Sequence, residues 1–244
     1  MTLTIRLSNY NLYFWLLLSS IVFHSITFAQ QDRFESGLAA KDRGHYATAL
    51  RAWLPIAESG NAQAQNNVGY MYEEGLGVPQ NYLLAMNWYR QAADNELAQA
   101  QHNMGMLYHH GYGVAQNLEE AFRWFKMAAD QELAESEYML GLAYEKGEGT
   151  ALNYGEARRL FLSSARKNYT PAQMMYAFML QAGEGGDSQP FRAYVWGKIA
   201  ESNGYKSAID ITTNSGIQLE DDEIIEAEEI TAACLTASLS LCPE

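Results

Sequence analysis

The side chains most suited to metal binding or pH sensing are three histidines that lie close together in the chain. His102 and His109 are seven residues apart and would share one face of a helix, with His110 beside them. Imidazoles on one face can hold a metal ion or sense pH. The alternative is that a histidine near a helix C-terminus only complements the helix dipole. Because no cysteine or recurring carboxylate completes a ligand set, we predict no metal and no cofactor.

The two cysteines, Cys234 and Cys242, are eight residues apart. A straight helix would separate their Cα atoms by about 12 Å, whereas a disulfide needs roughly 4.4–6.8 Å. If the helix ends near Ala237, the tail (SLSLCPE) can fold back and close the bridge. Two cysteines in an oxidising compartment usually pair, so we expect a disulfide. A pair of free thiols is the alternative, and the absence of Cys-x-x-Cys argues against sulfur chemistry as a function.

The sequence lacks several catalytic motifs that are common in hydrolases. His-Glu-x-x-His, Gly-x-Ser-x-Gly and paired metal carboxylates are missing from the sequence. The Gly-x-Gly pairs, such as Gly75 and Gly77, follow predicted helices rather than strands, so they are not nucleotide-binding loops. We therefore predict no catalytic residues.

A 36-residue period shows which elements carry these residues. Glycine recurs at 69, 105 and 141, and Gly-x-Gly recurs at 75, 111, 147 and 183. Trp88, Trp124 and Trp196 keep the same step, with Leu160 in the third slot. So many coincidences at one step indicate an internal repeat.

Each period reads as two helices. Ala64, Val68 and Tyr72 lie on one face of a first helix, which the glycine pair ends. Ala85 and Trp88, with Ala92, predict the inner face of a second helix. The second helices begin after Asn81, Asn117 and Asn153, whose side chains can cap free amides, and Glu120 and Glu156 complete a capping-box spacing.

The period predicts an all-α fold, an α-solenoid of about five stacked helix-turn-helix repeats in a right-handed superhelix. The expected boundaries are a signal peptide at 1–29, a degenerate N-terminal repeat at 30–61, repeats at 62–97, 98–133, 134–169 and 170–205, and C-terminal capping helices at 206–244.

The first helices of such a stack line its concave surface. At 100° per residue, the side chains opposite the core should form a groove with an apolar and aromatic floor and a charged edge. This groove suits a peptide or a helix of another protein; the alternative is a solvated, variable face. The expected partner-binding residues are Asn66, Tyr70, Glu73, His102, Met106, His109, Tyr138, Leu142, Glu145, Met174 and Phe178.

The repeats resemble the Sel-one-like repeat (SLR) family, solenoid relatives of tetratricopeptide repeats. The segments that carry the resemblance are AQNNVGYMYEEGLGVPQNYLLAMNWYRQAA (64–93), AQHNMGMLYHHGYGVAQNLEEAFRWFKMAA (100–129) and, less closely, 136–165. The fourth copy departs, with Ala177 in place of the glycine and Gln189 in place of the asparagine. The resemblance implies an adaptor that holds other proteins together, and many bacterial members are exported.

The N-terminal segment indicates export. Arg6 is followed by an apolar stretch at 12–23 (LYFWLLLSSIVF), and Thr27 and Ala29 stand at the −3 and −1 positions of a cleavage site before Gln30. We expect a periplasmic or secreted protein without a membrane span after cleavage. An uncleaved anchor is the alternative, although a span needs roughly 20 apolar residues and polar residues interrupt this stretch.

The charge excludes some partners. The chain has 29 acidic and 16 basic residues, a net charge of −13, which disfavours nucleic acid and anionic membranes. From Glu201 onward there are ten acids and one base, so residues 30–200 carry 19 acids and 14 bases, a net of −5.

The sequence therefore predicts a non-catalytic scaffold that binds a protein or peptide. A rival is a slow β-lactam-binding or β-lactam-hydrolysing enzyme, as the resemblance to the family's cysteine-rich branch implies. That branch carries a cysteine pair in every repeat, whereas this chain has one pair, at its end. A narrower version of the scaffold hypothesis is an assembly factor of a cell-envelope machine.

Overall fold

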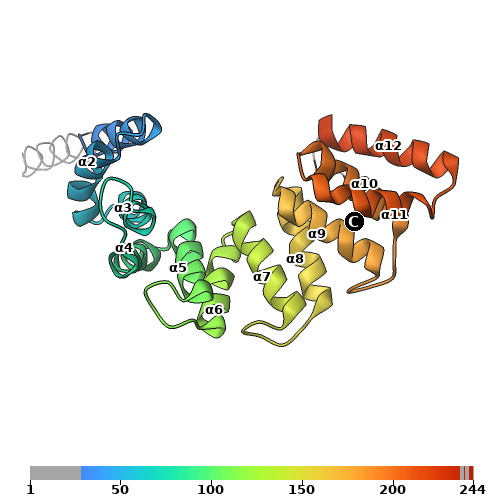
Figure 1. Ribbon diagram of the computed structural model, residues 1–244, viewed down its shortest axis with the longest axis horizontal. Helices are drawn as coiled ribbons and strands as arrows, with labels where there is room; N and C mark the ends of the chain where they lie inside the picture. Colours follow the sequence, from blue (N-terminus) through green and yellow to red (C-terminus); the bar gives the residue numbers. More distant parts are fainter. Residues whose placement is uncertain (1–28, 237–238, 240–241, 244) are drawn as a thin grey trace, which may run out of the picture. The chain divides into compact units, whose positions relative to one another are not determined.

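The computed structural model describes residues 29–236, 239 and 242–243. Every regular element in these residues is helical, as the all-α prediction requires. The chain divides into two compact units, residues 1–95 and 96–244, which are described separately (Figure 1). The predicted signal peptide and its apolar stretch at 12–23 lie outside the described residues. Within them, no helix combines the length and the apolar character that crossing a membrane requires.

The first unit consists of two antiparallel helix pairs. Residues 29–42 are helical and pair with α2. The next pair is α3 and α4, which pack closely against each other, while α2 packs on α3. The printed bounds are α2 Tyr46–Glu58, α3 Ala62–Glu74 and α4 Tyr82–Asp94.

The second unit continues the same pattern with three more helix pairs, followed from Lys206 onward by η1, α11, α12 and the tail, which we call the closing segment. From α5 to α11, each helix packs on its neighbours in the chain, and the last helix, α12, packs on α10. Within the predicted C-terminal capping helices, the chain first forms a short 3-10 turn, η1, and α11, which is shorter than the preceding helices. The bounds are α5 Ala98–His110, α6 Leu118–Ala129, α7 Ala134–Lys146, α8 Tyr154–Arg166, α9 Thr170–Ala182, α10 Pro190–Ser202, η1 Lys206–Ala208, α11 Ile209–Gly216 and α12 Asp221–Thr236.

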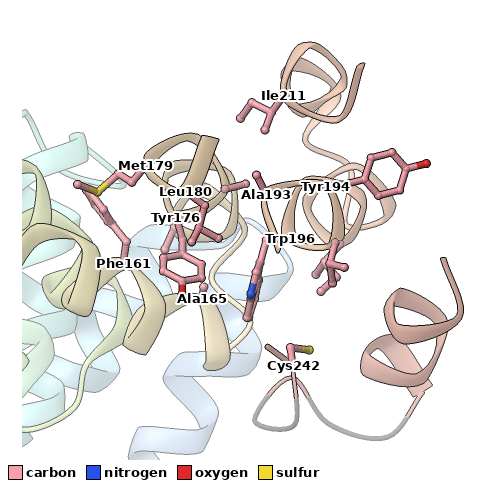
Figure 2. Packing of buried hydrophobic residues seen from close by; sticks show 14 of the residues in the cluster. Phe161, Ala165, Tyr176, Met179, Leu180, Ala193, Tyr194, Trp196, Ile211 and Cys242 are labelled. Carbon is pink, nitrogen blue, oxygen red and sulfur yellow. The ribbon is translucent and has the colours of Figure 1, made fainter. Parts of the chain in front are cut away.

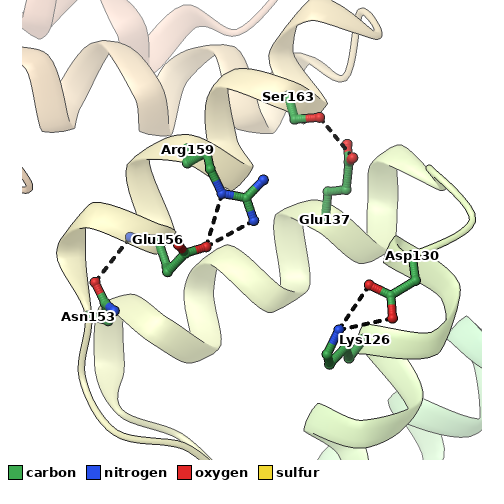
Figure 3. A network of polar contacts seen from close by, with 7 residues as sticks. All are labelled: Lys126, Asp130, Glu137, Asn153, Glu156, Arg159 and Ser163. Carbon is green, nitrogen blue, oxygen red and sulfur yellow. Dashed lines mark hydrogen bonds and ion pairs between the residues drawn. The ribbon is translucent and has the colours of Figure 1, made fainter.

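The predicted asparagine caps are confirmed. The side chains of Asn81, Asn117 and Asn153 each accept a hydrogen bond from the amide three residues later, at 3.0–3.1 Å. The reciprocal half of the capping box is not formed, because the amides of Asn117 and Asn153 donate instead to first-helix carbonyls. Glu156, freed from that role, pairs with Arg159 at 2.9 Å (Figure 3).

The Gly-x-Gly turns have two different requirements. The first glycine, as in Gly147, ends the helix in a left-handed conformation with φ of 71°. The second lies against the preceding repeat: a Cβ at Gly149 would meet the backbone of Leu118, and one at Gly185 would lie 2.5 Å from the carbonyl oxygen of Tyr154. The motif therefore fixes both the helix end and the approach of the next hairpin.

The interior of the hairpins at 62–97 and 98–133 differs from the prediction in one respect. The deeply buried ring of the second helix belongs to Tyr89, which is 0% exposed, whereas Trp88 is only partly buried. Phe125 and Phe161 continue the Tyr89 series at 2% and 0% exposure. On the first helix, Ala64 and Val68 are buried as predicted, while Met71 is buried in place of Tyr72. The buried stripe is therefore rotated by one residue at these positions.

The buried aromatic ring of the second helix packs directly against the recurring first-helix glycine. A Cβ at Gly69, Gly105 or Gly141 would lie 2.7, 2.5 or 2.7 Å from the ring of Tyr89, Phe125 or Phe161, respectively. A distance this short is a steric clash, so the position requires glycine.

The fourth and first hairpins pack differently from these three. In the fourth, the glycine position holds Ala177 and the ring position holds Gly197, where a Cβ would lie 2.6 Å from the Thr212 side chain of α11. In the degenerate first repeat, a Cβ at Gly37 would clash with the Trp53 ring, and the Trp53 indole donates to the Phe34 carbonyl at 3.1 Å.

The largest core of the second unit lies in its C-terminal half (Figure 2). Tyr176 of α9 and Trp196 of α10 meet edge to face, with ring centroids 5.5 Å apart. The Trp196 indole donates to the carbonyl of Pro243 at 2.8 Å, and Cys242 is 3% exposed. The tail is thereby held against the core.

A ladder of buried polar residues also follows the 36-residue period. Its members lie beside the first-helix alanines and are Gln65, Gln101, Glu137 and Gln173, all at most 6% exposed. Three of them accept a hydrogen bond from a residue 30 positions later, at the end of the second helix: Gln101 from Gln131, Glu137 from Lys167 and Gln173 from Asn203. Glu137 also accepts from Ser163 at 2.8 Å (Figure 3).

Candidate protein-binding face

The predicted partner-binding residues of the second unit lie along the first helices α5, α7 and α9. Phe178 on α9 is 38% exposed. Met106, Tyr138, Leu142 and Met174 are partly buried. Tyr138, Leu142 and Met174 pack against the buried core on one side, so only part of each side chain remains open to solvent. We call this surface of α5, α7 and α9 the first-helix face.

The three predicted residues of the first unit lie on α3. Tyr70 is 39% exposed, and the Lys41 ammonium lies 5.8 Å from the centroid of its ring. Glu73 is engaged inside the hairpin, because its carboxylate accepts a 2.5 Å hydrogen bond from the buried Tyr89 hydroxyl. Burial raises the pKa of Glu73 and that hydrogen bond lowers it. Asn66 is partly buried. Tyr70 is therefore the most accessible of the three.

His102 is partly buried and contacts the next hairpin. Its Nδ1 lies 2.8 Å from the Ser136 hydroxyl of α7, and its ring is tilted against the Phe125 ring, with centroids 5.6 Å apart. Burial lowers the pKa of His102 to about 4, although Glu135 acts in the opposite direction. The next repeat packs over this part of α5, and the binding role of His102 stays a prediction. His102 is a neutral contact between hairpins at neutral pH.

His109 lies beside a small cavity between hairpins. Its Nε2 is 3.7 Å from the Glu148 carboxylate, which belongs to the next turn. The cavity, of about 70 Å³, is lined mostly by apolar side chains of α6 and α7, including Phe122 and Leu142. The described residues contain no group of three or more metal-ligating side chains suited to hold an ion.

Glu145 lies near other carboxylates at the C-terminal end of α7. Burial raises its pKa, Lys146 lowers it, and Glu184 and Glu148 raise it further. This end of the first-helix face is therefore acidic.

Two tyrosines that the prediction missed extend this face. Tyr169 meets Tyr138 edge to face, with centroids 5.3 Å apart. Tyr205 raises the pKa of both, so it is close to them. Tyr169 and Tyr205 are 36 residues apart and each immediately precedes a helix. The sequence signal was therefore present, but the prediction searched only positions inside the first helices.

Cys234 and Cys242 lie away from the first-helix face. They are joined as a disulfide with their Cα atoms 5.6 Å apart. Cys234 is in α12, and the tail returns far enough to bury Cys242 beside α10. The disulfide is therefore part of the closing segment rather than of a binding site.

The sequence matches the Sel1 repeat four times in succession, at residues 62–97, 98–133, 134–169 and 170–205. A Sel1 repeat protein from Oxalobacter formigenes is 29% identical, with a TM-score of 0.70 over 82% of this chain and 84% of that chain. A protective antigen of uropathogenic Escherichia coli strains with an SLR fold is 24% identical, with a TM-score of 0.69. That alignment covers 90% of this chain but 52% of the antigen, so this chain spans about half its length. No curated protein sequence shows significant similarity.

Proposed function

This chain belongs to the Sel1 repeat family, and on that premise we propose that it is an exported, non-catalytic scaffold that binds a protein or peptide. Sel1 repeat proteins are commonly protein-interaction scaffolds. We place the binding surface on the first helices, the elements expected to line the concave side of a solenoid.

The observation that supports this surface is the partial exposure of large side chains at equivalent positions of successive first helices. Met106, Tyr138, Met174 and Phe178 lie along α5, α7 and α9, and the inner sides of Tyr138 and Met174 are fixed by packing against the buried core. Aromatic and methionine side chains fixed in this way lose little conformational freedom on binding, which makes them effective anchors in protein interfaces.

The proposal is tested by pull-down from an extract of the cell envelope, with the protein bearing Met106→Ala, Tyr138→Ala, Met174→Ala and Phe178→Ala compared with the wild type. We expect a partner that the wild type retains and this variant loses. Circular dichroism and thermal unfolding of both proteins establish that the variant is folded.

The matched control carries alanine at four exposed apolar residues outside the first helices: Leu83, Met127, Leu152 and Ile225. It should retain the same partner as the wild type. If the first-helix variant keeps every partner, or if the control loses the same ones, the first-helix face is not the binding surface.

Export is a separate part of the proposal, supported by the charged, apolar and small-residue order of residues 1–29. Mass spectrometry of the protein isolated from cells should give an N-terminus at Gln30. An intact N-terminus in a membrane fraction would instead support the anchor. A role as an assembly factor of a cell-envelope machine is a narrower form of the same proposal.

A further inference from the structure

Two tyrosines in this chain already hold a lysine next to carboxylates. In the second unit, the Lys198 ammonium lies 5.5 Å from the centroid of the Tyr194 ring. The Tyr194 hydroxyl donates to Glu228 at 3.3 Å, and Lys198 lies 3.9 Å from the carboxylate of Glu201. The face of a phenol ring attracts a cation, and the neighbouring carboxylates add to that attraction.

The second example is Tyr70 in the first unit. The Lys41 ammonium lies 5.8 Å from its ring centroid. Burial raises the pKa of Tyr70, and Glu74 and Glu73 raise it further, so both carboxylates act on the same ring. In both units, therefore, a tyrosine with two acidic neighbours is accompanied by a lysine of the protein itself.

A third group has the same chemistry with more rings. We call it the tyrosine patch: Tyr138, Tyr169 and Tyr205, with Glu135 and Glu145. The Tyr138 and Tyr169 rings meet edge to face, with centroids 5.3 Å apart. Burial, followed by Tyr205, Tyr169 and Glu145, raises the pKa of Tyr138 to about 12. The pKa of Tyr169 is raised by burial, then by Glu135 and Tyr205. The two carboxylates therefore act on the same group of rings.

Among the described residues, no lysine or arginine is found over these three rings. His102, which is close to Glu135, is neutral at neutral pH because burial lowers its pKa to about 4. Lys146 lowers the pKa of Glu145, whereas Glu184 and Glu148 raise it. The patch thus has the rings and carboxylates of the two occupied sites but not their cation.

We propose that the tyrosine patch binds a lysine or arginine side chain presented by a partner polypeptide. This inference rests on the proposed function and adds the chemistry of the partner. An ammonium or guanidinium over the rings would take the place that Lys198 and Lys41 occupy elsewhere. Glu135 and Glu145 would supply the charge complementarity, and a guanidinium could also stack flat on a ring.

Four fluorescently labelled nine-residue peptides serve as probes, identical except for two central residues that are lysine, acetyl-lysine, arginine or citrulline. Fluorescence anisotropy at physiological salt gives their dissociation constants. We expect the lysine or arginine peptide to bind at least about fivefold more tightly than its neutral isostere. Comparison of the lysine and arginine peptides identifies which cation is preferred. Equal affinity of charged and neutral peptides overturns the inference.

General attraction to an acidic protein is excluded with charge-matched variants. Glu135→Gln with Glu145→Gln should weaken binding of the charged peptide about fivefold or more. Glu226→Gln with Glu229→Gln removes the same charge from exposed positions of α12 and should leave it unchanged. Equal weakening by both pairs means non-specific attraction and overturns the proposal.

The rings are tested in the same way. Tyr169→Leu should weaken binding, because leucine keeps the apolar contact but lacks the π face. Tyr112→Leu, at an exposed tyrosine of the Gly111–Gly113 turn, should not. If the pull-down partner is lost from the first-helix variant but binds independently of Glu135 and Glu145, the scaffold function stands and this inference fails. If binding of the peptide depends on the patch but the first-helix variant loses no partner in the pull-down, this inference stands and the scaffold function fails.

Discussion

Each of the three clearest hairpins is closed by one aromatic ring pressed against a residue that has no side chain. The ring comes from the second helix and the glycine from the first, as in Phe125 and Gly105. The fourth hairpin has neither, with Ala177 at the glycine position and Gly197 at the ring position, where a Cβ would meet Thr212 of α11. In these four hairpins the ring and the glycine therefore occur together or not at all.

Gly105→Ala should destabilise the protein by about 1–3 kcal/mol, because its methyl group would overlap the Phe125 ring. Urea unfolding followed by circular dichroism measures the loss. The control is Gly155→Ala in α8, where the nearest atom to the new Cβ is the Asn153 side-chain oxygen at 3.4 Å. That variant should be at least as stable as the wild type, since alanine favours a helix. Equal stability of the two variants would contradict the requirement for glycine beside the Phe125 ring.

Lys167→Met should destabilise the protein by about 3 kcal/mol, because it leaves the buried Glu137 carboxylate without its cation. The double variant Glu137→Gln with Lys167→Gln installs the pair found as Gln101 and Gln131 in the preceding hairpin. It should recover most of the loss. Urea unfolding of the single and double variants gives the coupling energy, and a double variant no more stable than Lys167→Met would refute this account of the ladder.

His102 should make stability depend on pH. Its folded-state pKa of about 4 lies below the ordinary value of 6.5, so the unfolded chain binds an extra proton between these values. Stability should therefore be complete above about pH 6.5 and fall as the pH drops toward 4, with a slope of up to about 1.4 kcal/mol per pH unit. His102→Gln should remove this slope. Unfolding measured from pH 4 to 7 checks it; the same slope in both proteins would assign it to other groups.

At the scale of elements, helix starts are set by local chemistry. The Asn117 and Asn153 side chains cap α6 and α8, whereas Gln189 makes no side-chain cap bond to α10. Pro190, at the first position of α10, lacks the amide hydrogen that would otherwise need a partner. The fourth repeat therefore replaces a capping side chain with a residue that needs less capping.

Asn117→Ala should cost about 1 kcal/mol of stability, since the Glu120 amide loses its acceptor. Gln189→Ala should cost much less, because no cap bond is broken. Thermal unfolding under identical conditions compares the two variants. Losses of the same size would indicate that side-chain capping does not account for the asparagine at this position.

The helices and caps could be predicted because a few adjacent residues determine them. The Asn81 side chain caps the start of α4, and Gly75 ends α3. The 36-residue period repeats both signals along the chain. The position of His102 could not be predicted in this way, because a helical wheel assigns one inner face to each helix. In a stack, α5 packs against α6 and also approaches α7, as the His102–Ser136 contact shows. The Tyr169 and Tyr205 rings were missed because they lie just outside the helices that the wheel describes.

At the scale of the molecule, the helices pack mainly on neighbours in the chain, so stability should be local. The closing segment depends on α12 and on a tail fixed by the disulfide and by Trp196. Damage there should spread to the nearest hairpin first and leave distant ones intact.

Cys234→Ser with Cys242→Ser should destabilise the C-terminal end by about 2–3 kcal/mol through release of the short loop. Hydrogen–deuterium exchange read by mass spectrometry should show faster exchange in α10 to α12 and unchanged exchange in α2 to α4. Uniformly faster exchange would indicate that the chain unfolds as one cooperative block.

The buried polar ladder also constrains how the gene can change length. Each hydrogen-bonded pair spans 30 residues and the period is 36, so both partners fit inside one unit bounded at a hairpin junction such as Leu133–Ala134. Duplication or deletion of such a unit transmits matched partners. A 36-residue deletion that begins after Glu137 would keep the period but join Glu137 to Asn203, which leaves the buried carboxylate without its cation. Recombination that exchanges whole hairpins avoids leaving this buried charge unpaired.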